Sequence, residues 1–122
     1  MKGLDFYKYN KIFGLSVGIF SFIIYSLTVE PTASYWDCAE YISTSAKLQI
    51  GHPPGAPLFQ MLGAIFSIFA LESNQIAYAV NMMSVFSSSL TIMFLFWSIS
   101  LIAKEILKVK DCLLYTSDAA DD

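Results

Sequence analysis

The sequence predicts an all-α membrane protein, with several transmembrane helices and a short amphipathic helix in the first external loop. Composition is the first reason: 56% of the residues are hydrophobic and only 14% are charged, whereas about 25% are charged in an ordinary soluble domain. The second reason is a series of uncharged apolar runs, some of which approach the ~20 residues that cross a bilayer as a helix. The chain has no arginine and its lysines are scattered, so it lacks the basic face of a nucleic-acid-binding protein.

The first apolar run covers residues 12–29 and carries no charge, which predicts a transmembrane helix. A cleaved signal peptide is the alternative, but its apolar region is usually about 7–15 residues long and ends at a small-x-small site. Here the run is longer and leads into Glu30-Pro31, which favours an uncleaved helix. The run is preceded by Lys2, Lys8 and Lys11. Because positive residues stay on the cytoplasmic side, we expect a cytoplasmic N-terminus and an external loop over residues 30–55.

The external loop is predicted to hold a short helix on the membrane surface. Pro31 ends the preceding helix because it lacks the amide donor, and Ser34 with Asp37 three residues later matches a helix N-cap. Apolar residues recur at roughly helical spacing: Trp36, Ala39, Ile42, Ala46 and Ile50. The opposite side is polar: Asp37, Glu40, Tyr41, Thr44 and Lys47. We expect Gly51 to end the helix, because Pro53-Pro54 prevents its resumption.

Two further spans are predicted, over residues 56–71 and 76–103. The first of these is short for a span, whereas the second is longer than a helix needs to cross the ~30 Å hydrocarbon core. Lysines follow the last run at positions 104, 108 and 110. The positive-inside rule alone would then favour two spans rather than three. No charge lies inside any proposed span, which argues against an ion-conducting path.

The C-terminal segment, residues 112–122, reads CLLYTSDAADD and resembles a translated sequencing-adapter sequence. Such a segment should be excluded from fold reasoning. It contains three of the ten acidic residues, so without it seven acids balance seven lysines and the net charge of −3 becomes zero. We therefore expect residues 1–111 to be the N-terminal membrane region of a larger protein.

Four polar residues of the external loop are candidates for chemistry: Asp37, Glu40, His52 and Lys47. The two acids are three residues apart, which places both carboxylates on one helix face. Each candidate also has a structural interpretation. Asp37 can cap the helix, Glu40 can be a solvated side chain, His52 can stabilise a turn, and Lys47 can be an interfacial anchor. The two cysteines, Cys38 and Cys112, have neither metal-ligand spacing nor a disulfide framework, and we expect no metal site.

The loop also resembles a known family. The residues that carry the resemblance are Pro31 to Tyr41, PTASYWDCAEY, and His52 to Leu58, HPPGAPL, placed between two apolar runs. They are similar to the N-terminus of GT-C glycosyltransferases, which are polytopic membrane enzymes. Within these, the chain is closest to a bacterial family of unknown function related to the animal transmembrane protein O-mannosyltransferase of plexin-type receptors. The resemblance covers about residues 10–105. Many members have glycine where Ala39 stands.

This resemblance implies transfer of a sugar from a polyprenyl-phosphate donor to a hydroxyl of a protein or glycan acceptor, on the outer side of a bacterial inner membrane. It favours three spans, and it implies no cofactor beyond the lipid-linked donor. Asp37 would then activate or orient the acceptor hydroxyl, Glu40 would support it, and His52 and Lys47 would lie on the phosphate side. Two other classes stay open at this point: a fragment of a transporter or channel, and a non-catalytic membrane scaffold.

Overall fold

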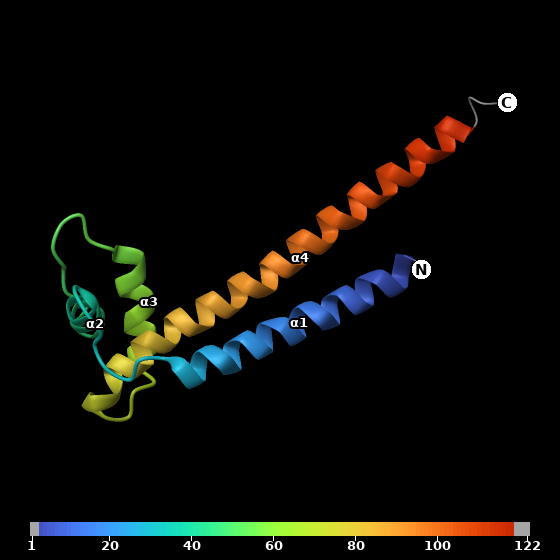
Figure 1. Ribbon diagram of the computed structural model, residues 1–122. Coiled ribbons are helices and arrows are strands. Elements are labelled where there is room, and N and C mark those ends of the chain that lie inside the picture. The colour runs from blue at the N-terminus through green and yellow to red at the C-terminus, as the bar shows by residue number, and fades with distance from the viewer. Residues whose placement is uncertain (1–2, 119–122) are drawn as a thin grey trace. The chain divides into compact units, whose positions relative to one another are not determined.

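The computed structural model describes residues 3–118, and this part of the chain is helical without strands, which confirms the all-α prediction. Its elements are α1 (Gly3–Thr28), α2 (Cys38–Lys47), α3 (Pro57–Ser67), the short 3-10 helix η1 (Ser73–Gln75) and α4 (Ile76–Asp118), as Figure 1 shows. The chain divides into two compact units. One contains the residues up to Ile19 and those from Leu90 onward, and the other contains Phe20–Ser89.

Within residues 3–118, two helices are long and apolar enough to cross a membrane, over Phe6–Thr28 and Ser73–Leu107. Only 11% of each apolar window is buried within the protein, so most of these side chains are free to contact lipid. α3 is also apolar, but its 11 residues correspond to about 16 Å of helix, roughly half the hydrocarbon thickness. It is shorter than the span predicted over residues 56–71, and the three-span arrangement stays a prediction.

In the first unit, the start of α1 pairs with the later part of α4 in the opposite direction. The indole Nε1–H of Trp97 donates to the backbone oxygen of Asn10 at 3.0 Å, and Ser100 Oγ donates to Asn10 Oδ1 at 2.7 Å. About one turn beyond Ser100, the Lys104 ammonium lies 3.8 Å from the centre of the Tyr7 ring. These contacts pair polar groups of the two apolar helices with each other across their interface.

In the second unit, α2 packs directly on α3 through small residues. Ser45 of α2 is fully buried, and a Cβ added to Gly63 of α3 would lie 2.7 Å from its Oγ. Val80 of α4, at 1% exposure, completes this contact. The buried apolar side chains of this unit are Ile42, Ala79, Val80, Met83 and Val85. The close approach of α2 and α3 therefore depends on glycine and serine rather than on a wide apolar stripe.

The predicted boundaries and apolar face of α2 are wrong. The N-cap position is Asp37 and not Ser34, and no side chain caps the helix. The helix ends at Lys47, before Gly51, because Leu48 takes a left-handed conformation at φ 48°. The amides of residues 48 and 49 then donate to carbonyls of the last turn, which closes the helix without glycine.

Burial on α2 follows its contact with α3 instead of the predicted stripe. Trp36 and Ile50, the two ends of that stripe, lie outside the helix and are 93% and 97% exposed. The buried positions are Ile42, Thr44 and Ser45. The face of α2 that contacts the protein is therefore mixed, because a close helix contact favours small side chains; the Thr44 hydroxyl is hydrogen-bonded there, whereas the buried Ser45 hydroxyl has no hydrogen-bond partner.

The segment between α1 and α2 is fixed to α4 by one side chain. The Asn81 amide donates to the backbone oxygens of Glu30 and Thr32, at 2.8 and 3.0 Å. The Glu30 carboxylate also accepts the Thr32 hydroxyl at 2.7 Å. These bonds determine where the chain leaves α1 on its way to the candidate residues of α2.

The predicted helix over residues 76–103 exists but continues to Asp118. It therefore runs into the segment 112–122 that resembles an adapter sequence, and residues 119–122 of that segment lie outside the described residues. The foreign origin of this segment stays a prediction.

Candidate functional site: an imidazole between two carboxylates

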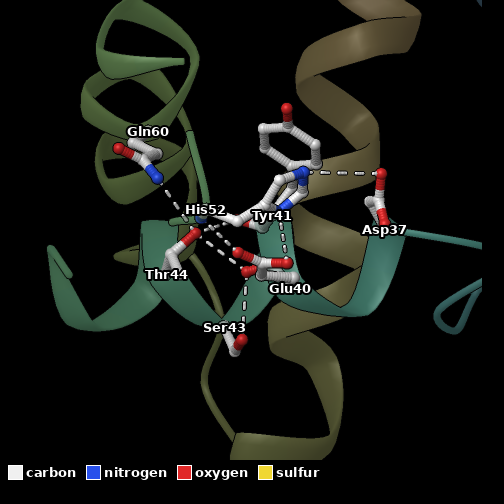
Figure 2. A network of polar contacts seen from close by, with 7 residues as sticks. All are labelled: Asp37, Glu40, Tyr41, Ser43, Thr44, His52 and Gln60. Carbon is white, nitrogen blue, oxygen red and sulfur yellow. Dashed lines mark hydrogen bonds and ion pairs between the residues drawn. The ribbon is translucent and has the colours of Figure 1, made fainter. Parts of the chain in front are cut away.

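Three of the four candidate residues meet at one place in the second unit. Asp37 precedes α2, Glu40 lies in its first turn, and His52 lies in the segment between α2 and α3. The backbone N–H of His52 donates to Glu40 Oε1 at 2.7 Å, and His52 Nδ1 lies 2.7 Å from Glu40 Oε2. On the other edge of the ring, His52 Nε2 lies 3.9 Å from Asp37 Oδ2. Figure 2 shows the imidazole with Glu40 on one side and Asp37 on the other.

The path of the chain after α2 brings His52 back to a residue twelve positions earlier. The left-handed Leu48 reverses the direction at the helix end. Gly51 then passes so close to α2 and α3 that an added Cβ would lie 3.1 Å from Glu40 Oε1 and 3.2 Å from Gln60 Nε2. A turn that includes a cis Pro53-Pro54 bond follows, closed by the Gly55 amide on the His52 carbonyl at 2.9 Å. The helix and the turn are thus joined by the Glu40 carboxylate.

A second layer of polar contacts supports Glu40 from within the unit. The Thr44 hydroxyl donates to the Glu40 backbone oxygen at 2.8 Å, and Gln60 of α3 donates to Thr44 Oγ1 at 3.2 Å. Ser43 Oγ donates to the same backbone oxygen at 3.0 Å (Figure 2). The sequence interpretation placed Thr44 on the solvated side and gave Gln60 no role. Their spacing from Glu40 was visible, but the α2–α3 contact that joins them was not.

Mutual contact shifts the pKa values of Glu40 and His52. The hydrogen bonds from the backbone and side chain of His52 lower the pKa of Glu40 below its ordinary 4.5. The hydrogen bond and charge of Glu40 raise the pKa of His52 above its ordinary 6.5. A lowered carboxyl pKa adds stability that is lost as pH falls through it, and a raised imidazole pKa adds stability that is lost as pH rises through it. The pair therefore stabilises the turn fully between pH 4.5 and 6.5.

The structure does not bring Lys47 to this cluster. Lys47 is exposed and lies in the last turn of α2, seven residues after Glu40, which is about 10 Å along a helix axis. Among the described residues it makes no ion pair with either acid. Its predicted role on the phosphate side stays a prediction.

The cluster has ligand atoms of the kind that bind cations. Asp37, Glu40 and His52 each offer one atom, and the three atoms lie within 4.8 Å of one another. However, both Glu40 oxygens are engaged by His52, and so is ring nitrogen Nδ1. Only one carboxylate and one ring nitrogen are left, fewer than the three protein ligands of a catalytic zinc site. We therefore assign no catalytic zinc to these residues.

The chain is thus an all-α protein with two helices of membrane-spanning length and an exposed acid–imidazole cluster in the segment between them. The family model described as the protein O-mannosyl-transferase TMEM260 N-terminal domain matches residues 37–120. The match covers more than half of the chain, and the chain belongs to this family. All three residues of the cluster lie within the matched range, which also extends into the segment 112–122.

Two curated relatives carry the same name. The protein O-mannosyl-transferase tmem260 of Dictyostelium discoideum is 36% identical over 80 residues, which are 65% of this chain and 10% of the relative. The protein O-mannosyl-transferase TMEM260 of Mus musculus is 28% identical over 86 residues, 69% of this chain and 12% of the relative. The chain therefore spans about a tenth of the length of these relatives. No solved structure matches it.

Proposed function

We propose that this chain is the N-terminal membrane part of a GT-C-type glycosyltransferase that moves a sugar from a polyprenyl-phosphate donor to a hydroxyl acceptor. The sugar is mannose, as the names of the relatives suggest, and the acceptor is a protein or a glycan. The observation that carries the proposal is the open Asp37 carboxylate beside the oriented His52 imidazole, in a family of named O-mannosyltransferases.

Glycosyl transfer to a hydroxyl requires a group that removes or holds the hydroxyl proton while the new bond forms. Asp37 is suited to orient or activate the acceptor, because its side chain is 53% exposed and makes no capping bond to α2. The developing charge on the lipid phosphate requires donors, and Lys47 is our candidate for that role. Glu40 contributes through His52, since both of its oxygens contact that residue.

The experiment that tests this function uses the full-length protein that contains this chain. Membranes with the protein are incubated with polyprenyl-phosphate [14C]mannose and acceptor protein, and radiolabel on the acceptor is counted. A parallel reaction supplies the same sugar as a nucleotide sugar in membranes free of polyprenyl phosphate. We expect transfer only from the lipid-linked donor. Absence of transfer from that donor, by protein shown to be folded, would overturn the proposal.

We also propose that the loop containing the cluster faces the outside of the inner membrane of a bacterium, with a cytoplasmic N-terminus. The residues after Met1 include Lys2, Lys8 and Lys11, and positive residues before a first span stay inside. Single cysteines at Ser43 and Gln49, both exposed, are introduced in a background without Cys38 or Cys112. An impermeant thiol reagent should label them in intact cells. Labelling that requires lysis would instead place the loop in the cytoplasm.

A further inference from the structure

Both oxygens of the Glu40 carboxylate contact one residue, His52. One of its oxygens accepts the backbone N–H of His52, and the other contacts Nδ1 of the ring, both at 2.7 Å. An ionised carboxylate can only accept hydrogen bonds, so Nδ1 carries the proton that it donates. This defines the tautomer of the neutral ring: Nε2 is left with its lone pair free.

The free ring nitrogen and Asp37 together form an open site for a hydroxyl group. Nε2 lies 3.9 Å from Asp37 Oδ2, which is too long for a direct hydrogen bond. A hydroxyl group has one hydrogen to donate and both atoms are acceptors, so a hydroxyl oxygen about 2.8 Å from Nε2, within ordinary hydrogen-bond range, donates to that nitrogen with the Asp37 carboxylate beside it. Both side chains are about half exposed, at 49% for His52 and 53% for Asp37, so a substrate can reach them. A carboxylate that holds Nδ1–H while Nε2 faces a hydroxyl is the geometry of an imidazole general base.

We propose that His52 Nε2 receives the proton of the acceptor hydroxyl and that Glu40 is the positioning residue that orients it. The inference rests on the proposed function. In the step, the acceptor oxygen forms its bond to the sugar C1 as the bond from C1 to the phosphate oxygen breaks. The electron pair of that bond leaves with the lipid phosphate. The acceptor proton moves to Nε2 and later passes to water, while Asp37 stabilises the imidazolium that forms.

Histidine suits this role better than a second carboxylate does. A general base works best when its pKa lies near the working pH, and ordinary carboxyl groups titrate about two pH units below an imidazole. The hydrogen bond and charge of Glu40 raise the pKa of His52 further above that of the carboxyl groups. The role differs from the phosphate-side role that the sequence suggested, because a phosphate donor must be the protonated imidazolium, whereas a base must be neutral.

The two roles predict opposite pH dependences. If His52 is the base, turnover rises with pH through the pKa of His52. If it donates to the leaving phosphate, turnover falls through the same pKa. The titratable groups that face the ring are Glu40 and Asp37, while α3 presents the uncharged Gln60 near Glu40. Glu40→Gln removes the charge that raises the pKa of His52. The rise of turnover with pH should therefore occur at lower pH in this variant.

The test measures transfer from polyprenyl-phosphate mannose by full-length protein across pH 5–9, with Glu40→Gln, His52→Gln and, as a matched control, Glu72→Gln. Glu72 is an exposed glutamate before η1, so its variant should keep the wild-type profile. The turnover of His52→Gln should be lower by about a hundredfold or more, which is the usual contribution of a general base to the rate. Its turnover should also no longer rise with pH. Glu40→Gln should shift the rise of turnover to lower pH, which a merely structural role would not do.

Each of the other outcomes overturns either the proposed function or only the assignment of His52 as the base. No transfer by the wild type overturns the proposed function and the base assignment with it. If Glu40→Gln transfers the sugar with an unshifted pH profile, only the inference is overturned. The same holds if the turnover of the wild type falls as pH rises through the pKa of His52.

Discussion

Asp37→Asn should lower the turnover of the full-length enzyme by roughly a hundredfold or more while the protein stays folded. Asparagine keeps the shape of the side chain but removes the charge that orients the acceptor hydroxyl and stabilises a neighbouring imidazolium. Asp37 Oδ2 lies 3.9 Å from His52 Nε2, close enough for that charge to act on the ring. The measurement is single-turnover transfer from polyprenyl-phosphate mannose, with donor binding determined separately.

The structure sharpens this test because it weakens the capping explanation. Asp37 occupies the N-cap position of α2, yet its side chain makes no cap hydrogen bond. The remaining structural contribution is the effect of a negative charge near a helix N-terminus, typically about 0.3–1 kcal/mol at an exposed site. Glu72→Gln removes a similar exposed charge before η1 and serves as the control. Near-normal turnover by folded Asp37→Asn protein would show that the carboxylate has no part in transfer.

The positions of the long helices could be predicted because they depend on local composition. Residues 12–28 of the first predicted span lie inside α1, which ends at Thr28, and residues 76–103 lie inside α4, since an uncharged apolar run of sufficient length has one stable form in lipid. The ends could not be predicted in the same way. α4 continues past the lysine at position 104, which lies over the Phe6 and Tyr7 rings of α1. A charged residue ended the apolar run but not the helix, because a partner helix supplies its contact.

The candidate site was predictable in its members but not in its connections. The spacing of Asp37 and Glu40 placed the two carboxylates on one side, and His52 was singled out as the one histidine of the chain. The Glu40–His52 pair was missed, because it requires the reversal at Leu48 and the close passage of Gly51. A left-handed leucine has no sequence signal, since only glycine and asparagine are favoured there. The surface helix was likewise misplaced, because its packing on α3 overrode the apolar periodicity.

Gly14→Ala should destabilise the pairing of α1 and α4 in the first unit. A Cβ at this position would overlap Nε1 of Trp97, so the indole would have to leave its place. The bond from Nε1–H to the Asn10 carbonyl, now 3.0 Å long, would be lost with it. Overpacking of this kind costs about 1–3 kcal/mol, and the lost hydrogen bond adds about 1 kcal/mol. Thermal unfolding of the full-length protein in detergent, followed by circular dichroism, would measure the loss.

The control must account for helix propensity, because alanine in a helix interior is favoured over glycine by about 0.8–1 kcal/mol. Gly18→Ala carries the same gain, but its Cβ would meet the flexible Met93 side chain at 3.1 Å, so its net effect should be small. In a Trp97→Ala background the indole that would collide with the new Cβ is absent. Gly14→Ala should then leave the stability unchanged or raise it. If Gly14→Ala lowers the stability equally with and without Trp97, then Gly14 is not needed to make room for the indole.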